Sequence, residues 1–221
     1  MMWKALKTLA EPTFLYHPLR NAVMRARGRR ELACWELEGR PTPPPHVAKH
    51  IALRDCALRF HLQIFVETGT HRGDTLEAMR PYFDTLYSIE LSAELFAKAR
   101  RRFRRCHSVR LIHGDSGKVL RSLLTCVNRA TLFWLDSHYV EIDESSARGE
   151  VDTPIREELS CILDAPDLGH VIVIDDARLF GVDPSYPPLD EVTNLVRSRL
   201  PTARISVVDD MIRVTPGHDP A

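Results

Sequence analysis

Five short apolar runs alternate with helix-like segments through the middle of this chain. The runs cover residues 63–67, 86–90, 109–113, 131–136 and 170–176, and β-branched and aromatic residues dominate them. Such runs are typical of strands that are buried on both faces. Helix-like stretches lie between them at 73–82, 92–105, 116–127 and 153–164. This alternation predicts right-handed βαβ units and one parallel sheet.

The last two apolar runs follow a different pattern. After a predicted helix at 189–199, the runs 203–208 and 211–215 are separated only by Asp209 and Asp210. So short a link cannot make a parallel crossover, so this pair is predicted to be an antiparallel hairpin. The expected architecture is therefore an α/β sheet of five parallel strands closed by a C-terminal antiparallel hairpin, with helices on both faces.

Prolines mark a boundary near residue 45. Pro41 and the run 43–45 break any helix, so we expect an N-terminal helical extension at 1–45 and a main domain at 46–221. Residues 1–30 carry a net charge of +6, and the remainder carries the opposite charge. The extension would pack on the main domain or on a second copy in a homodimer, and both alternatives stay open. A weakly amphipathic helix is predicted at 47–60, with Val47, Ile51 and Leu58 on one face.

Charge and cysteine content limit the function classes. The chain has 30 Lys+Arg and 30 Asp+Glu, so its overall charge gives no reason to expect a nucleic-acid partner. The basic run at 98–105 is interpreted as a solvated helix end. No apolar run is long enough to span a membrane. The five cysteines are scattered and form no C-x-x-C pair, which favours reduced thiols and a cytoplasmic location.

Ligands of open α/β sheets bind beyond the carboxyl ends of the strands, so the residues that follow each strand are the candidate site. The first strand runs into a turn with glycines at 69 and 73. Gly69 would let the backbone turn tightly against a ligand, and Gly73 would allow close packing of the next helix. A plain strand–helix turn is the alternative.

The next two strands end in polar side chains suited to a nucleoside. Glu90 lies about twenty residues after the glycine turn, where an acid accepts hydrogen bonds from a ribose diol. Asp115 would accept from an exocyclic amine, and Ser116 would donate to a ring nitrogen. The alternatives are an exposed acid at the strand end for Glu90 and a helix N-cap for Asp115.

Three carboxylates follow the fourth and fifth strands. Asp136, Asp175 and Asp176 would repel one another if they were left unpaired, and a divalent cation relieves that repulsion. Hard oxygen ligands suit Mg²⁺, Mn²⁺ or Ca²⁺. The alternative is an acidic rim that is paired with Arg178 or Arg148.

Together these positions resemble the class I S-adenosylmethionine-dependent methyltransferases over residues 60–215. ETGTHRGD is similar to their first motif, YSIE to the acidic end of their second strand, and HGDS to their adenine-contacting turn. LDSHY and VIDDAR further resemble the metal-dependent O-methyltransferases of the catechol and macrolide/sugar types. The departures are a glycine-poor approach at Gly69 and a long acidic insertion at 137–155.

The resemblance implies a set of site residues. S-adenosylmethionine would be bound by Glu67, Thr68, Gly69, Thr70, Gly73, Asp74, Thr75, Glu90, Asp115, Ser116 and Asp136, and a metal ion by Asp136, Asp175 and Asp176. The expected substrate is a small hydroxylated molecule such as a sugar, a polyketide glycoside or a phenol. The metal would lower the pKa of its hydroxyl, and the enzyme would hold the methyl group in line.

Other roles follow from the same resemblance. Asp136 and His138 are the catalytic candidates, His138 either as a general base or as a residue that orients a ligand or packs. Tyr139, Arg148 and Thr153 lie on one predicted substrate loop. Arg178 would either neutralise the acidic pair or bind an anionic substrate. The alternative function is a non-catalytic protein that keeps the fold and the cofactor site.

Overall fold

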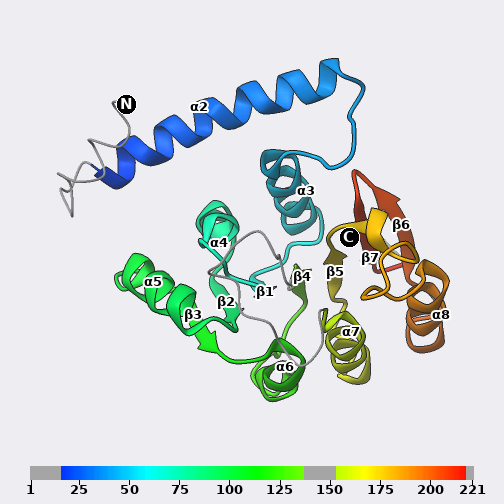
Figure 1. Cartoon of the computed structure of the whole chain (residues 1–221). Coiled ribbons are helices and arrows are strands. Elements are labelled where there is room, and N and C mark those ends of the chain that lie inside the picture. The colour runs from blue at the N-terminus through cyan, green and yellow to red at the C-terminus, as the bar shows by residue number, and fades with distance from the viewer. Residues whose placement is uncertain (1–15, 137–152, 218–221) are drawn as a thin grey trace. The chain divides into compact units, whose positions relative to one another are not determined.

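The computed structural model describes residues 16–136 and 153–217. Its contacts divide the chain into two units, Met1–Lys49 and His50–Ala221. The second unit contains a seven-stranded sheet in the order β3-β2-β1-β4-β5-β7-β6 (Figure 1). The strands are β1 (Ile64–Thr68), β2 (Thr85–Glu90), β3 (Val109–His113), β4 (Thr131–Leu135), β5 (Val171–Ile174), β6 (Arg204–Val208) and β7 (Met211–Thr215).

The topology confirms the predicted sheet. Strands β1 to β5 pair in parallel, and β7 pairs antiparallel with both β5 and β6. Asp209 and Asp210 form the turn of the hairpin, with φ of 52° and 63°. Positive φ at both central residues is the type I′ geometry that matches the twist of the flanking strands, and Asp tolerates it better than most residues.

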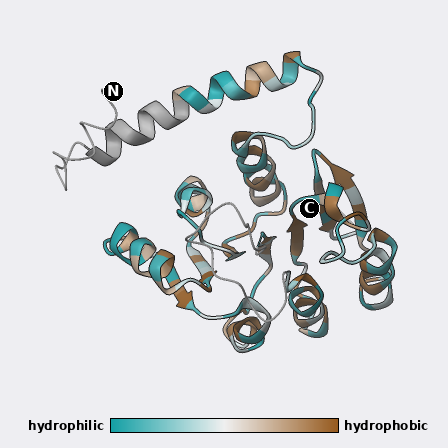
Figure 2. Ribbon diagram, viewed as in Figure 1, coloured by the Kyte–Doolittle hydropathy of each residue, from teal (hydrophilic) through white to brown (hydrophobic). Residues whose placement is uncertain are grey.

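Helices cover both faces of the sheet (Figure 1). On one face lie α6 (Ser116–Leu124), α7 (Ile155–Asp164) and α8 (Leu189–Arg199), which bury their apolar sides against β1, β4, β5 and β7. On the other lie α3 (His46–Arg59), α4 (Asp74–Met79) and α5 (Ala93–Phe103). Short 3₁₀ helices at Arg80–Tyr82 and Ala177–Leu179 follow α4 and β5. Figure 2 shows the strands as mainly hydrophobic and the helices as two-sided.

Two sequence expectations need correction. The predicted apolar face of the helix at 47–60 was wrong: Leu58 is 58% exposed, and Leu53 and Ala57 are buried instead. The small side chains of Ala52, Cys56 and Ala57 let this helix pack on the sheet alongside Leu53. The run 109–113 was expected to be buried on both faces, but β3 is a half-exposed edge strand.

The N-terminal unit contains α2 (Tyr16–Leu37) and the proline-rich segment after it. Trp35 joins these two parts, because its Nε1 donates a hydrogen bond to the carbonyl oxygen of Pro41 at 2.7 Å. The guanidinium of Arg40 stacks over the Trp35 ring at 4.7 Å. Among the helices that the structure describes, none combines the length and apolar character needed to cross a bilayer.

Candidate functional site

The strand order reverses direction between β1 and β4, which are neighbours in the sheet although two strands separate them in sequence. Ligands of open α/β sheets bind at such a switch point, outside the carboxyl ends of the strands. Here the two strand ends are joined, since the backbone N–H of Asp136 donates to the carbonyl and to Oγ1 of Thr68, both at 3.3 Å. The candidate residues of the five parallel strands therefore share one edge.

The glycine turn after β1 has the geometry that its sequence predicts. Gly69 and Gly73 have φ of 85° and 70°, values that side chains rarely allow. A Cβ on Gly73 would lie 2.6 Å from the ring of Phe103, so this glycine lets α5 pack closely against the turn. The backbone N–H groups of Gly69 and Thr70 donate to the carbonyl of Ile89 at 3.0 and 3.2 Å, which joins the turn to β2.

The side chains that open α4 already have protein partners. Asp74 accepts a 2.7 Å hydrogen bond from Arg102 of α5. Thr75 Oγ1 lies 3.3 Å from His50 Nε2 of α3. These contacts fix the start of α4 against the two helices beside it, while Asp74 remains 42% exposed.

Glu90 holds two loops together at the end of β2. Its Oε2 accepts the backbone N–H of His71, and its Oε1 accepts that of Ser92, both at 2.8 Å. The Glu90 side chain is buried. A carboxylate has about four lone-pair positions, so each oxygen retains capacity for a ligand hydroxyl. Glu90 therefore joins the turn after β1 to the start of α5.

A buried chain of polar groups lies beneath the turn. Ser88 Oγ donates to Glu67 Oε2 at 2.7 Å, and Thr70 Oγ1 lies 2.6 Å from the same Ser88 oxygen. Burial raises the pKa of the Glu67 carboxyl to about 8, the Ser88 hydrogen bond opposes this rise, and the charges of Asp136 and Glu90 add to it. Glu67 is 1% exposed, so near neutral pH its carboxyl is mostly protonated.

The end of β3 carries the predicted helix cap. Asp115 is the N-cap of α6, and its Oδ1 accepts the backbone N–H of Gly117 at 3.0 Å. Ser116 is buried. At the same end of the sheet the His113 ring stacks on Phe96 of α5, with ring centroids 5.0 Å apart.

Three carboxylates meet beyond β4 and β5. One oxygen from each of Asp136, Asp175 and Asp176 can be chosen so that all three lie within 4.8 Å of one another. Asp175 and Asp176 are 4% and 5% exposed. Asp175 Oδ1 accepts the backbone N–H of Asp176, whose φ of 56° turns the chain sharply after β5. The sequence prediction that these residues converge is confirmed.

Arg178 lies beside this group. Its guanidinium donates to Asp176 Oδ1 at 2.7 Å and also to Asp210 Oδ2. The backbone N–H of Arg178 donates to Asp210 Oδ1 at 2.8 Å, so the turn of the terminal hairpin holds this arginine in place. Arg178 thus contributes one positive charge beside the three carboxylates.

A small pocket of about 10 Å³, enough for roughly one water molecule, opens beside Asp136 and Asp175. Thr153, which was predicted to contact substrate, lines it. Two lining residues were not found from the sequence: Glu158 of α7, which is 1% exposed, and Tyr186, from the loop before α8. Burial and the nearby carboxylates of Asp176, Asp136 and Asp175 raise the pKa of the Tyr186 hydroxyl.

No sequence signal pointed to these two residues. Tyr186 lies on a loop with no motif, where its ring packs on Phe180 at 5.1 Å, and Glu158 is one of two adjacent acids on a helix. Three of the predicted residues, His138, Tyr139 and Arg148, lie outside the described residues. Their expected roles therefore stay predictions.

Comparison with known proteins gives a result at the level of structure only. No protein-family model matches the sequence, and no curated protein matches it. Solved structures do match. A methyltransferase of Podospora anserina, PaMTH1, bound to S-adenosylhomocysteine, is 15% identical with a TM-score of 0.54, over 94% of this chain and 98% of its own.

Two further structures give the same picture. A putative caffeoyl-CoA O-methyltransferase of Staphylococcus aureus is 10% identical with a TM-score of 0.52, over 91% of this chain and 99% of its own. The O-methyltransferase TomG of Streptomyces achromogenes, in complex with S-adenosylmethionine, is 18% identical with a TM-score of 0.50, over 86% and 88% of the two chains. This chain therefore has the class I methyltransferase fold, as its motifs predicted.

Proposed function

We propose that this protein is an S-adenosylmethionine-dependent methyltransferase that methylates a hydroxyl of a small molecule with the help of a divalent cation. The observation that carries the proposal is the convergence of Asp136, Asp175 and Asp176 at the switch point of a methyltransferase fold. A site of this kind joins a nucleoside-binding edge, formed by β1 to β3, to a cation-binding corner, formed by β4 and β5.

The donor set fits a hard cation. Three carboxylate oxygens that lie within 4.8 Å of one another could serve as ligands of Mg²⁺, Mn²⁺ or Ca²⁺, which all prefer oxygen donors. When bound, such an ion lowers the pKa of a coordinated hydroxyl so that an alkoxide or phenolate is available near neutral pH. Arg178 would hold Asp176 in orientation beside it.

The cofactor would lie along the ends of β1, β2 and β3. Its sulfonium supplies an electrophilic methyl group, and the residues of the chain position it. Glu90 would accept the ribose hydroxyls, and Asp115 and Ser116 would face the adenine. Glu67, Thr68, Gly69 and Thr70 form the turn under the amino-acid part, with the start of α4 at Gly73, Asp74 and Thr75 behind them.

The acceptor would enter above Asp136. Thr153 and Tyr186 line that side of the site, and His138, Tyr139 and Arg148 of the acidic insertion are the remaining substrate candidates, with His138 as general base. We propose a sugar, a polyketide glycoside or a phenol as the acceptor, because the motifs after β4 and β5 resemble those of the catechol and macrolide/sugar O-methyltransferases. We also propose a cytoplasmic location, supported by five cysteines that form no disulfide, and residues 1–45 would pack either on the main domain or on a second copy in a homodimer.

The cofactor part is tested by calorimetric titration with S-adenosylhomocysteine. We expect one site per chain, and we expect Glu90→Ala to weaken binding because both ribose hydroxyls lose their acceptor. Asp167→Ala, an exposed acid in the loop before β5 and so at the other end of the strands, is the matched control and should bind as the wild type does. No binding by the wild type, with or without Mg²⁺, would contradict the proposal.

The metal part is tested by titrating Mn²⁺ and following its free signal by electron paramagnetic resonance. Asp175→Asn and Asp176→Asn should each weaken Mn²⁺ binding by at least about tenfold. Asp183→Asn is the control. It removes the charge of a nearby carboxylate that accepts the backbone N–H of Ser185, and it should change Mn²⁺ affinity little. Equal Mn²⁺ affinity in all variants would remove the metal role.

Cofactor binding without methyl transfer to any hydroxylated acceptor would favour the non-catalytic alternative.

A further inference from the structure

The edge of the sheet formed by α5 and β3 carries an unusual run of positive charge. Residues 95–114 contain no acid. They contain seven basic residues, which are Lys98, Arg100, Arg101, Arg102, Arg104, Arg105 and Arg110. We call residues 95–114 the α5–β3 edge.

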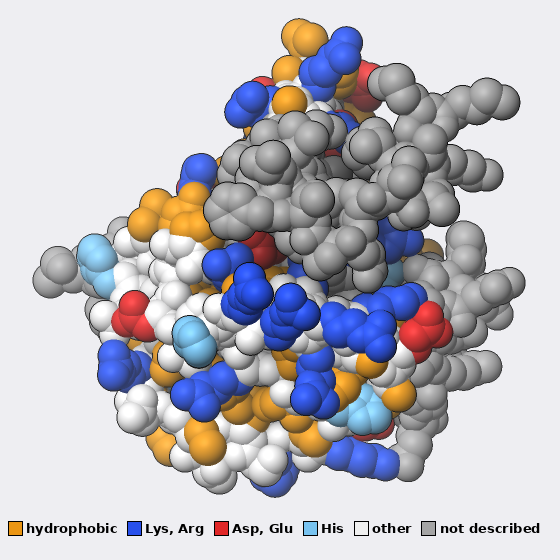
Figure 3. Space-filling view, turned by 90° about the vertical axis from the view of Figure 1, so that its left-hand side faces the viewer, with side chains coloured by type: hydrophobic (Ala, Val, Ile, Leu, Met, Phe, Trp, Pro, Cys, Tyr) orange, Lys and Arg blue, Asp and Glu red, His pale blue; other side chains and the backbone are white. Residues whose placement is uncertain are grey.

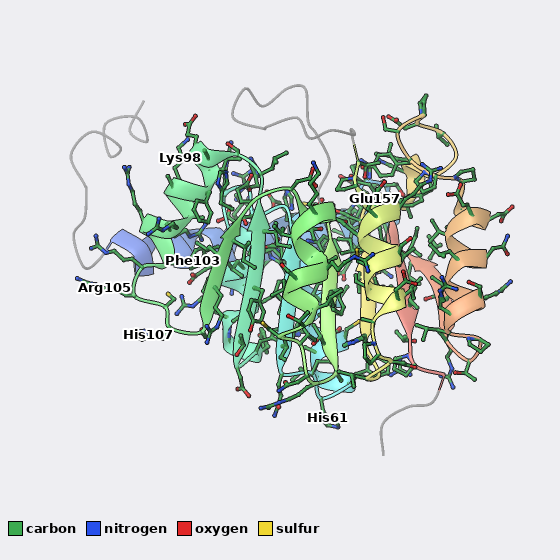
Figure 4. All side chains as sticks on the ribbon, turned by 90° about the horizontal axis from the view of Figure 1, so that it is seen from below. His61, Lys98, Phe103, Arg105, His107 and Glu157 are labelled. Carbon is green, nitrogen blue, oxygen red and sulfur yellow. The ribbon has the colours of Figure 1, made fainter. Side chains whose placement is uncertain are left out.

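The fold gathers these charges on one side of the molecule. Helix α5 runs antiparallel to β3 along the end of the sheet, and the loop that carries Arg104 and Arg105 joins them. Figure 3, which looks at this side, shows Lys and Arg side chains in a band, with acidic side chains toward its margins. In Figure 4, Lys98, Arg105 and His107 follow one another along the same edge of the sheet.

Most of this charge is not balanced within the described part of the chain. Lys98 pairs with Glu94 at 2.6 Å, and Arg102 pairs with Asp74 at 2.7 Å. No salt bridge to a described residue involves the exposed arginines Arg100, Arg101, Arg104, Arg105 and Arg110. The edge therefore presents five guanidinium groups to solvent.

The stability of the fold explains only some of them. Basic residues in the last turn of a helix interact favourably with the helix dipole, which accounts for Arg100, Arg101 and Arg102. Arg104 is the C-cap residue of α5 and Arg105 follows it, so the dipole favours these two as well, whereas Arg110 lies on β3, where no helix dipole gives a reason for positive charge. Like charges this close repel one another, so their accumulation suggests an anionic partner.

The composition of the edge indicates the chemistry of that partner. Six of the seven basic residues are arginines, whose planar guanidinium matches phosphate oxygens in pairs. None of the large hydrophobic side chains that are exposed in the described residues lies within 93–113, so the edge offers no apolar anchor for a lipid bilayer. At the carboxyl end of β3, the Phe96 ring stacks on the His113 ring, and its centroid lies 5.8 Å from the Arg100 guanidinium. Rings of this kind support bases in nucleic-acid complexes.

We propose that the α5–β3 edge binds the phosphodiester backbone of a nucleic acid. This goes beyond the proposed methyl transfer and does not make the nucleic acid the methyl acceptor. It also revises the expectation drawn from the net charge of zero, because phosphate binding depends on local charge and residues 95–114 contain no acid.

The test is fluorescence anisotropy with labelled single-stranded RNA, single-stranded DNA and duplex DNA at several salt concentrations. The triple variant Arg104→Glu/Arg105→Glu/Arg110→Glu should lose most of the affinity. For a single strand, the slope of log K against log salt should become shallower by about 0.7 per lost contact, or roughly 2 in all. The three probes separate an RNA source of the phosphodiester from a DNA source.

The matched control is Arg197→Glu/Arg199→Glu/Arg204→Glu, which makes the same change of charge on exposed residues of α8 and β6, at the other end of the sheet. It should keep nucleic-acid binding, and both variants should keep binding of S-adenosylhomocysteine, which shows that they fold. If the wild type binds no nucleic acid at low salt, or if both variants lose binding equally, the proposal is overturned. Tighter binding to phosphatidylserine vesicles or to polyglutamate would also overturn it. None of these outcomes depends on methyl transfer.

Discussion

Single residues at the carboxyl edge fix the local structure of the candidate site. Glu90 joins two loops through backbone N–H groups, and Asp115 caps α6 at the same end of the sheet. Both were found from the sequence because a strand end fixes where such a side chain must lie. Tyr186 and Glu158 were not found, because a loop and a helix bring them to the pocket from distant parts of the chain.

Gly73 gives the sharpest stability prediction at this scale. Gly73→Ala combines a left-handed φ of 70° with a Cβ 2.6 Å from Phe103, so it should cost about 1–2 kcal/mol for the backbone and roughly 1–3 kcal/mol for the clash. Gly169→Ala has a φ of 78° but no atom within 4 Å of the new Cβ, so it should show the backbone cost alone. Urea unfolding of both variants measures the difference. Equal losses would show that Phe103 does not constrain the turn.

Glu67 gives a prediction about pH. Because burial raises the pKa of Glu67 from 4.5 to about 8, the folded state favours the protonated carboxyl. The resulting contribution to stability is complete below the unfolded pKa and is lost as the pH rises through about 8. Glu67→Gln should therefore gain stability relative to the wild type as the pH rises from about 5 to about 9.

Urea unfolding at several pH values measures this relative gain. The exposed Glu157→Gln is the control, and its stability should follow that of the wild type. If the free energies of unfolding of Glu67→Gln and the wild type change in parallel with pH, the Glu67 carboxyl is ionised over the whole pH range tested, and burial does not hold it protonated.

At the scale of elements, the terminal hairpin does more than complete the sheet. Its turn residue Asp210 accepts hydrogen bonds from the backbone and the guanidinium of Arg178, which in turn holds Asp176. The position of one carboxylate of the cluster thus depends on a turn that lies far away in the sequence. Asp209 and Asp210 were read only as turn residues, because spacing shows a hairpin but not what its turn touches.

Asp210→Ala tests this link. The Asp210 side chain is 1% exposed, and its loss removes the acceptor of the Arg178 backbone N–H and one of the two carboxylates that bind the Arg178 guanidinium, so the variant should lose about 1–3 kcal/mol of stability. It should also bind Mn²⁺ more weakly, because Asp176 loses its orientation. Asp167→Ala removes an exposed acceptor of one backbone N–H, that of Gly169, and should change neither property much. Normal Mn²⁺ binding by Asp210→Ala would show that the hairpin does not position the cluster.

The sequence predicts the positions of helices and strands better than it predicts which of their faces are buried. Each predicted strand lies close to an observed one, because continuous apolar runs between turn residues leave few other assignments. The buried face of α3 was misjudged, since three small residues and Leu53 make the contact, and small residues give a weak pattern. The exposure of β3 also needed the structure, because a strand's place at a sheet edge is a property of the strand order.

At the scale of the whole molecule, charge is segregated around a neutral total. The carboxylates of Asp136, Asp175 and Asp176 lie at the corner beyond β4 and β5, and the arginines of the α5–β3 edge lie at one end of the sheet. A count over the full sequence hides this separation, and only the fold shows which charges share a surface. The candidate cofactor and metal residues thus lie at the switch point, and the arginine-rich surface lies apart from them at the sheet edge.

The proposed site would hold S-adenosylmethionine and a divalent cation side by side. The most direct test is the NMR linewidth of S-adenosylmethionine carrying a ¹³C-labelled methyl group, bound to the protein with Mn²⁺ and then with Mg²⁺. We expect strong paramagnetic broadening with Mn²⁺, no paramagnetic broadening with Mg²⁺, and loss of the effect in Asp175→Asn/Asp176→Asn. A bound methyl group whose line is equally sharp with both ions would contradict this proposal.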